Sequence, residues 1–556
     1  MTELAGSADH DTAPPDRSGV FRRAVLGTSA AALATTVGWL LAPPMGIDLA
    51  AQVARGDFWA RNGAAVLDFG WYGGLSPYSY SLITPPLMSL SGGGVDGARR
   101  VGAVFAVLAS VLFVLLLCRT GARRPLIGGL LGTVGIVGNL ISGRITFTAG
   151  LAFGLATLLA LTSRRAWLKR VGGVVGGVLT GAASPVAGLF LALAAVALLV
   201  TTKTSGRRWE ALLVAAAAGS SIMSMSVLFG VNGPMNSIPG DTLRSATVSL
   251  AVALLVNRPA VRVGALLSCA GVLAAAALTT PVGLNAGRLS ATFALGVLGA
   301  YATVPDRIRL PRRLAVPLSR RLPAPVQRAA GLVALLAVVA LWQHPFAVKE
   351  LSQAGNPMAS AARFRPLLAE MARFGPVGRV EVVPTDAFWE AARVVDTVPL
   401  ARGWLRQADT DRNPIFFDGR LSNATYYGWL QANGVSLVAL ADGPTAPAGA
   451  AEARLVRRAP AYLHRVWGGD GWSLYQVADS PSVVVGATLL SSTDDGIDLA
   501  VAHAGDVLVR VRWSRWLVAR GPAGCLAPTA DSWTTLRVRT PGTYVISGSL
   551  EPGPFC

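Results

Sequence analysis

Acidic residues are so scarce in the apolar part of the chain that each can be considered by itself. Between residues 97 and 305 they are Glu210 and Asp241, and both are predicted to lie in loops. Asp48 follows directly on the first apolar run, at the start of a segment, residues 46–86, that is rich in aromatic residues, Asp and Gly. A carboxylate at that place can act as a general base toward a hydroxyl. It can equally be the N-cap of the helix predicted to follow it, and the residues leave both readings open.

Metal and nucleotide chemistry have no motif in this sequence. The histidines are far apart and lie outside the apolar runs; they are His10, His344, His464 and His503. No Gly-Lys dipeptide occurs, so a phosphate-binding loop of the usual form is absent. We therefore predict no cofactor, and a divalent metal has no support in the sequence.

The composition indicates the surroundings in which such a carboxylate would work. Of the 556 residues, 52% are hydrophobic and 14% are charged, whereas soluble domains have roughly 25% charged residues. In a soluble protein, a net charge of +19 would indicate binding to nucleic acid. Here the basic residues stand in short clusters between long apolar runs. That pattern is typical of a membrane protein. We predict a polytopic membrane protein in contact with lipids, with no nucleic-acid partner.

About eleven apolar runs are predicted to form membrane-spanning helices. They cover residues 24–43, 101–118, 126–142, 145–162, 171–183, 186–201, 211–229, 246–256, 263–280, 290–304 and 330–343. Several are shorter than the roughly 20 residues that a helix needs to cross the hydrocarbon. Clusters of Arg and Lys occupy every second loop, the last of them at 307–328. This alternation predicts a multi-pass protein of the cell membrane with a cytoplasmic N-terminus and an extracytoplasmic region beyond residue 344.

The chain divides into four predicted parts. Residues 1–23 are polar and are expected to form a disordered cytoplasmic tail. Residues 24–344 form the transmembrane domain, whose first outer loop is 44–98. Strands and helices alternate over 345–480, which predicts an extracytoplasmic α/β domain. Short strands separated by turns fill 481–556, which predicts a domain similar to a β-sandwich.

Two cysteines lie in the outer β-rich part, where thiols can be oxidised. We predict that Cys525 and Cys556 are joined and that the bridge ties the C-terminus to a preceding strand; the alternative is two unpaired thiols. Cys118 and Cys269 lie in or at the edge of apolar runs and are predicted to be small apolar packing residues.

The first outer loop resembles that of a known superfamily. It has an Asp just after the first span, then a predicted juxtamembrane helix, then WYGGLSPYSYSLITPPL at 71–87. This order is similar to GT-C integral membrane glycosyltransferases, which take sugars from polyprenyl-phosphate carriers. SGRITFTAGLAF at 142–153 and NAGRL at 285–289 are similar to the actinobacterial branch of these proteins. The resemblance covers residues 24–345 and implies a GT-C-like transmembrane fold.

The resemblance also implies roles for single residues. Asp48 matches the catalytic base of the superfamily. Arg144 and Arg288 are predicted at outer ends of spans and would hold the donor phosphate; the alternative is that they reach the lipid headgroups. Many members place a second acid or a His near the base, often to help hold a metal. Here the next acids are Asp57 and Asp68 with no His nearby, which favours a metal-free mechanism.

Further residues are predicted to bind the sugar or the acceptor. These are Asp57, Asp68, Trp71, Tyr72, Tyr78 and Tyr80, although an aromatic belt at the membrane interface explains the four aromatic residues nearly as well. In the outer region, Trp513 and Trp516 either bind a glycan or pack between two sheets. The polar and aromatic segment 402–419 is expected to cap the mouth of the site.

The function implied by the resemblance is inverting transfer of a sugar from a polyprenyl-phosphate donor to a cell-envelope glycan or glycolipid acceptor on the outer face. Two alternatives belong to other classes of protein. One is a lipid or glycan transporter, and the other is a non-catalytic scaffold of envelope assembly with a GT-C-like membrane domain. A cavity that ends at Asp48 would favour the enzyme, and a continuous path through the membrane would favour transport.

Overall fold

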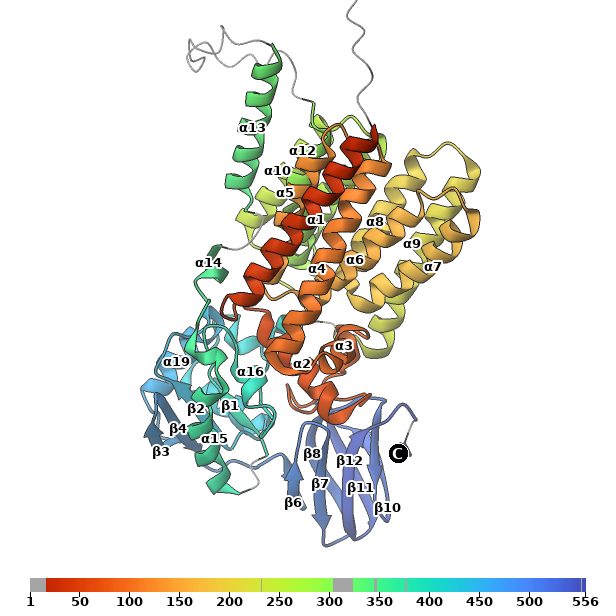
Figure 1. The fold of residues 1–556 in the computed structure, drawn as a ribbon. Coiled ribbons are helices and arrows are strands. Elements are labelled where there is room, and N and C mark those ends of the chain that lie inside the picture. The colour runs from red at the N-terminus through yellow and green to blue at the C-terminus, as the bar shows by residue number, and fades with distance from the viewer. Residues whose placement is uncertain (1–16, 232, 304–323, 345–347, 376–377, 552) are drawn as a thin grey trace, which may run out of the picture.

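The computed structural model describes residues 17–231, 233–303, 324–344, 348–375, 378–551 and 553–556. Most of the predicted N-terminal tail and of the Arg-rich loop at 307–328 lies outside the described residues. In Figure 1, long helices form a bundle, and the strands of the C-terminal region lie beyond one end of it. The coarse prediction of a helical membrane part followed by a β-rich part is confirmed.

In the described part of the chain, a helix overlies each of the eleven predicted spans. These helices are α1 (Arg17–Leu41), α4 (Gly94–Arg119), α5 (Pro125–Ile141), α6 (Ile145–Ala160), α7 (Ala166–Ala183), α8 (Pro185–Thr201), α9 (Ser205–Phe229), α10 (Pro239–Leu255), α11 (Pro259–Ala277), α12 (Arg288–Tyr301) and α13 (Ala324–Trp342). Among them α1, α4, α9, α11 and α13 are long and apolar enough to cross a membrane, and α5, α6 and α8 are apolar but shorter. The number of spans and their orientation stay predictions.

Close packing of α5 against α12 sets the geometry of the end of the bundle that faces the β-rich region, here named the outer end. A Cβ atom on Gly135 of α5 would lie 2.1 Å from the carbonyl oxygen of Thr292 on α12. A Cβ atom on Gly132 would lie 2.2 Å from the ring of Phe113 on α4. Small residues let helix backbones approach each other in this way. The turn after α5 and the start of α12 are therefore held in fixed positions.

The first outer loop lies between the bundle and the β-rich region (Figure 1). It forms the helices α2 (Leu49–Asn62) and α3 (Thr84–Leu90) and the 3-10 turn η1 (Pro77–Ser79). Nine residues of α2 are buried, because the helix packs against α3 and α4 on one side and against the outer helix α16 (Glu390–Arg393) on the other. Asp48 therefore starts a helix that is enclosed by protein.

A four-stranded sheet forms the centre of the first outer unit. Its order is β1 (Val380–Val382), β2 (Leu437–Ala441), β4 (Trp472–Val477), β3 (Leu463–Gly469), and only the β1–β2 pair is parallel. Its other helices and helical turns are α14 (Val348–Leu351), η4 (Pro357–Ala359), η5 (Ala361–Arg363), α15 (Arg365–Met371), η6 (Ala372–Phe374), α17 (Arg406–Arg412), η7 (Pro414–Phe416), α18 (Asn423–Ala432), η8 (Pro447–Gly449) and α19 (Ala450–Arg457).

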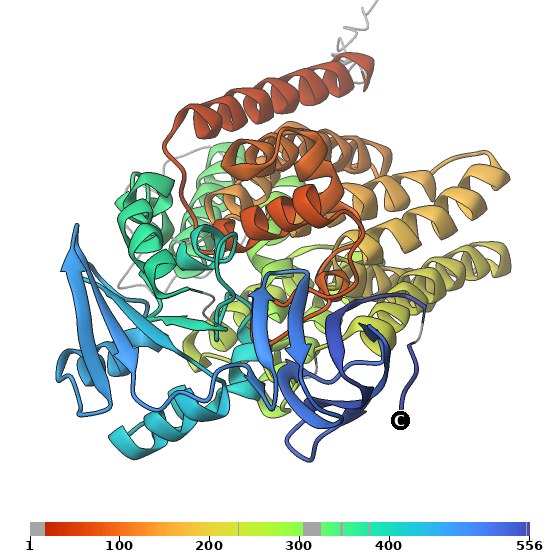
Figure 2. The ribbon, with the colours of Figure 1, turned by 90° about the horizontal axis from the view of Figure 1, so that it is seen from below.

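The last part of the chain forms two antiparallel four-stranded sheets. Their orders are β10-β11-β8-β5 and β6-β7-β12-β9. The strands are β5 (Val484–Val485), β6 (Thr488–Ser492), β7 (Gly496–Val501), β8 (Gly505–Arg512), β9 (Leu517–Arg520), β10 (Ala523–Pro528), β11 (Trp533–Thr540) and β12 (Gly542–Gly548). Burial alternates along β7 and β8, so each presents one apolar face to a shared core. Figure 2 shows this sandwich beside the first outer unit, beneath the helices.

A disulfide closes the C-terminal end of the sandwich. It joins Cys525 on β10 to Cys556, the last residue of the chain. The backbone N–H of Cys556 also donates a hydrogen bond of 3.0 Å to the carbonyl oxygen of Leu526. The bond and the backbone contact together place the C-terminal residues beside strand β10.

Candidate functional site

Three residues from distant parts of the sequence meet at the outer end of the helical bundle. Oδ2 of Asp48 lies 3.3 Å from Nε of Arg144 and 3.8 Å from Nη2 of Arg288. Asp48 precedes α2, Arg144 lies between α5 and α6, and Arg288 begins α12. The side chains are 16–27% exposed, so the cluster is enclosed but still reachable from outside the protein.

Direct contact between two backbone segments positions Asp48 beside Arg144. The N–H of Asp48 donates a hydrogen bond of 3.1 Å to the carbonyl oxygen of Ser142. Gly46 and Gly143 have φ angles of +98° and +76°, which favour glycine. A Cβ atom on Gly143 would lie 2.3 Å from the backbone nitrogen of Leu49. Glycine is therefore required in the Ser-Gly-Arg sequence for the approach of the two segments.

The structure does not support the N-cap reading of Asp48. Its side chain makes no capping hydrogen bond to the N-terminus of α2. The carboxylate instead faces the two guanidinium groups, as an ionic partner would. Helix capping therefore does not account for an aspartate at this position.

Contacts within the protein also position the side chains of Arg144 and Arg288. Both face Asp48, and the guanidinium of Arg288 lies 5.5 Å from the ring centre of Phe147, within the range of a cation–π contact. The alternative that these side chains only reach toward lipid headgroups does not explain their convergence on one carboxylate.

Arg55 is a residue of the site that the sequence reasoning missed. It lies seven residues after Asp48, on the same side of α2, and is 6% exposed. Its guanidinium lies 3.9 Å from the ring centre of Tyr80. Burial lowers the pKa of Arg55, while the nearby charges of Tyr80, Asp48 and Asp68 act in the opposite direction. The helical spacing from Asp48 was a signal that could have found it.

The outer unit adds a second acid and another cation. Glu350 on α14 has a buried Oε2 atom with no hydrogen-bond partner in the described structure. Burial raises the pKa of Glu350, and the charge of Arg144 opposes that rise. Burial lowers the pKa of Arg406 on α17, and the charge of Asp48 is among those that oppose it. Arg406 belongs to the segment 402–419 that was expected to cap the site.

The other predicted acids lie elsewhere in the first outer loop. Oδ1 of Asp57 accepts a hydrogen bond of 2.6 Å from the N–H of Gly94. Oδ1 of Asp68 accepts one of 2.8 Å from the N–H of Gly70. Burial, followed by the charge of Asp494, raises the pKa of Asp68 to about 7. These contacts hold the loop together and do not place either acid beside Asp48.

The aromatic residues of the loop form packing contacts. Trp71 and Tyr72 are 3% and 2% exposed, so neither ring has a free face for a sugar, which corrects the prediction for these two residues. Trp71 Nε1 donates to the carbonyl oxygen of Ala391, and the Tyr72 hydroxyl donates to that of Gly403. The Tyr78 hydroxyl donates to another loop carbonyl, that of Ala64, at 2.7 Å. The physical reason is that the outer units cover this loop, which places its aromatic residues in an interface within the protein.

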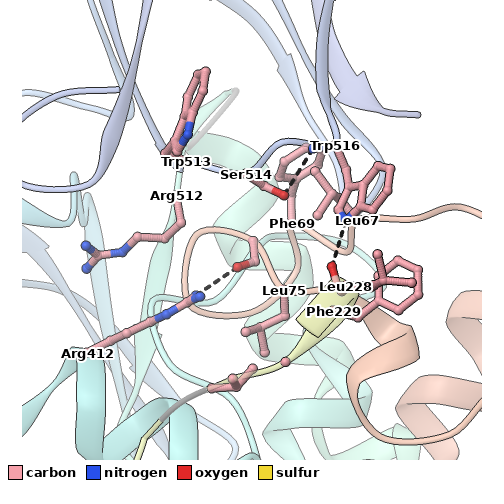
Figure 3. Close-up of a pocket in the computed structure, with 14 residues that line it drawn as sticks. Leu67, Phe69, Leu75, Leu228, Phe229, Arg412, Arg512, Trp513, Ser514 and Trp516 are labelled. Carbon is pink, nitrogen blue, oxygen red and sulfur yellow. Dashed lines mark hydrogen bonds between the residues drawn. The ribbon is translucent and has the colours of Figure 1, made fainter. Parts of the chain in front are cut away.

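Two hollows lie at the same outer end of the molecule, and neither is lined by Asp48. The first, here named the junction cavity, has a volume of about 120 Å³ (Figure 3). The second is an apolar groove of about 310 Å³ lined by Leu82 and by residues near the outer ends of α7 and α9. Within the described residues, no group of three or more His, Cys, Asp or Glu side chains is placed to hold a metal ion.

The fold and the cluster together define a class of protein: a multi-pass helical membrane protein with a carboxylate between two arginines at one end of the bundle. No family model matches the sequence, and no curated protein matches it. The chain is similar to the solved structure of the arabinofuranosyltransferase AftD from Mycobacteria, with 13% identity and a TM-score of 0.46 over 95% of this chain. It spans 57% of the length of that protein.

A second solved structure, ArnT from Cupriavidus metallidurans in the apo state, has 12% identity and a TM-score of 0.46, over 81% of this chain and 97% of that one. Identities of 12–13% and TM-scores below 0.5 assign no function to this chain.

Proposed function

We propose that the protein is an inverting glycosyltransferase that moves a sugar from a polyprenyl-phosphate donor to a hydroxyl group of a cell-envelope glycan or glycolipid on the outer face. The observation that carries the proposal is the contact of Asp48 with Arg144 and Arg288 at one end of the helical bundle. Such a transfer needs one base for the acceptor and cations for the donor phosphate.

The reaction assigns one role to each group. A carboxylate oxygen of Asp48 takes the proton of the acceptor hydroxyl, and the acceptor oxygen forms a bond to the anomeric carbon. The bond between that carbon and the phosphate oxygen breaks, and the lipid phosphate leaves with the electron pair. The leaving phosphate is already a stabilised anion and requires no acid. Arg144 and Arg288 hold it by charge-assisted hydrogen bonds.

The ion pairs in the structure link donor binding to the readiness of the base. In the structure, the guanidinium groups of Arg144 and Arg288 face Asp48. A bound phosphate competes for the same N–H groups and leaves Oδ2 of Asp48 free to accept the hydroxyl proton. A transporter or a scaffold would not need this arrangement, so those two alternatives become outcomes of the tests.

Replacement of either arginine is expected to weaken the use of the donor. For Arg144→Gln and Arg288→Gln we expect kcat/KM for the lipid-linked donor to fall roughly tenfold to a hundredfold, the usual cost of a lost hydrogen bond to a charged group. Lysine variants should recover only part of the loss, because lysine lacks the bidentate geometry of arginine. The assay is transfer by the purified protein, with membrane extracts as the source of donor and acceptor.

The matched control is Arg244→Gln. Arg244 is an exposed arginine of α10 whose one ion pair among the described residues is with the nearby Asp241 at 3.1 Å. Its replacement should leave transfer unchanged. Unaltered donor kinetics in the variants of Arg144 and Arg288, with folding verified by thermal unfolding, would contradict the phosphate-binding role.

A further inference from the structure

The junction cavity lies where four separate parts of the chain meet. It is lined by the first outer loop from Leu67 to Ser76, by the end of α9 from Leu228 to Val231, by α17 through Arg412, and by the sandwich from Arg512 to Trp516. Figure 3 shows Arg412 reaching toward the loop and Trp516 reaching toward Leu228. The volume of about 120 Å³ exceeds the ~30 Å³ that one water molecule occupies in the liquid. The space is therefore large enough for a small charged group.

The positive charge at this place is not balanced by ion pairs. Within the described residues, neither Arg412 nor Arg512 has a carboxylate oxygen within 4.0 Å of its guanidinium nitrogens. Burial and then the charge of Arg512 lower the pKa of Arg412 to about 10, and the charge of Asp411 only partly opposes this. Burial and then the charges of Arg512, Arg510 and Arg412 lower the pKa of the adjacent Arg379 to about 9. Like charges are thus held together, and an anion would relieve their repulsion.

Both lining arginines keep N–H groups for a ligand. Nη1 of Arg412 donates to the carbonyl oxygens of Tyr72 and Gly74, and Nη1 of Arg512 donates to that of Asp531. The remaining nitrogens of the two side chains make no hydrogen bond within the described part of the protein, and Nε of Arg512 is buried. Attachment to carbonyl groups explains how the arginines are positioned, but it does not neutralise their charge.

The tryptophans of the sandwich border the same cavity. Trp516 Nε1 donates a hydrogen bond of 2.9 Å to the carbonyl oxygen of Leu228, and its ring packs on Phe229. Trp513 contacts the ring of Phe555. Both side chains pack against the core of the sandwich and are only partly buried, so part of each ring stays accessible. Aromatic faces beside guanidinium groups are suited to a ligand that combines a sugar ring with a negative charge.

We propose that the junction cavity binds the anionic group, a carboxylate or a phosphate, of an acidic saccharide, with Arg412 and Arg512 as its partners. Helix α17 connects this cavity to the candidate active site, because Arg406 at its first position interacts with the charge of Asp48 and Arg412 is its last residue. Six residue steps of a helix span about 9 Å. The cavity therefore adjoins one end of α17, and the other end of the helix carries the arginine that senses the charge of Asp48. Identification of the saccharide as the acceptor rests on the proposed function.

The test measures binding separately from transfer. Full-length protein in detergent is titrated with cellobiouronic acid, with its neutral counterpart cellobiose, and with inorganic phosphate as a competitor, using tryptophan fluorescence and calorimetry. We expect the uronate to bind at least roughly tenfold more tightly than cellobiose, and phosphate to displace it. Arg512→Gln should weaken binding roughly tenfold to a hundredfold, Arg512→Lys should weaken it less, and Arg520→Gln, which changes an exposed arginine of β9, should have no effect.

The outcomes separate this inference from the proposed function. The Asp48→Asn variant should bind the uronate as the wild type does, even where transfer is lost. Equal binding of charged and neutral disaccharides, failure of phosphate to compete in the wild type, or unchanged binding by a folded Arg512→Gln variant would overturn the acidic-saccharide site. Binding of anionic lipid in nanodiscs through Arg512, with no binding of the disaccharide, would also overturn it in favour of a lipid headgroup.

Discussion

Asp48→Asn is expected to abolish sugar transfer while the protein stays folded. Loss of general-base assistance typically lowers a rate roughly 100- to 10,000-fold. The carboxylate makes no capping hydrogen bond, so the amide removes no helix cap. Oδ2 of Asp48 lies 3.3 Å from Arg144 and 3.8 Å from Arg288, and the three side chains are partly exposed. Ion pairs between partly exposed groups contribute little to stability.

The measurement compares turnover of Asp48→Asn with that of three other Asp→Asn variants, at Asp57, Asp68 and Asp241, with thermal unfolding as the check of folding. Asp241 is the matched control, because it is an exposed acid near the start of a helix. If Asp48→Asn turns over near the wild-type rate while one of the others is inactive, the base is that other residue. If all four remain active, the mechanism proposed here is wrong.

Arg402→Met is expected to destabilise the first outer unit more than any change at an exposed ion pair. Arg402 is 3% exposed at its side chain and contacts Asp409 at 2.9 Å, Glu452 at 2.8 Å and Glu381 at 3.7 Å. Removal of one partner from a buried ion pair typically costs about 3–5 kcal/mol, because the remaining charge stays buried without compensation. Arg402 is placed just before α17, so both Arg406 and Arg412 depend on this network.

The loss of stability caused by Arg402→Met should depend on pH. Burial raises the pKa of both Glu381 and Glu452, and Arg402 opposes that rise. Without the guanidinium, the folded variant binds protons more readily than the unfolded chain does. Its stability therefore falls as the pH rises above the pKa of an unfolded glutamate, and the deficit should be larger at pH 8 than at pH 5.

Thermal and denaturant unfolding of the full-length protein at these two pH values checks the expectation. Arg373→Met is the control, because Arg373 is 74% exposed in its pair with Glu370. A variant of Arg402 that unfolds together with the wild type at both pH values would show that the buried network does not stabilise this unit.

Much of the fold could be predicted from the apolar runs in the sequence. Each apolar run predicted from composition coincides with a helix, because burial in lipid and burial in a helical bundle select the same residues. The resemblance assigned Asp48, Arg144 and Arg288 to one site, and the structure places the two arginines 3.3 and 3.8 Å from the carboxylate of Asp48; the roles of the three residues stay predictions. Gly143, directly before Arg144, belongs to the motif at 142–153. A glycine is needed there because it permits the close contact of two backbone segments.

The rest of the site depends on tertiary packing that no local pattern records. Glu350 and Arg406 come from the outer unit, far along the chain from Asp48. Trp71 and Tyr72 have the composition of a membrane-interface belt, and only the arrangement of the outer units shows that they are buried. Arg412 and Arg512 are 100 positions apart in the sequence, so no local pattern could predict that they line the same cavity.

The most direct test of the central claim is an experimental structure of the protein in nanodiscs with a polyprenyl phosphate bound. We expect a phosphate oxygen within hydrogen-bond distance of the guanidinium groups of Arg144 and Arg288, with Oδ2 of Asp48 released from them and open to the outer face. A phosphate bound elsewhere, with the ion pairs of Asp48 unchanged, would contradict the assignment of this cluster as the site of sugar transfer.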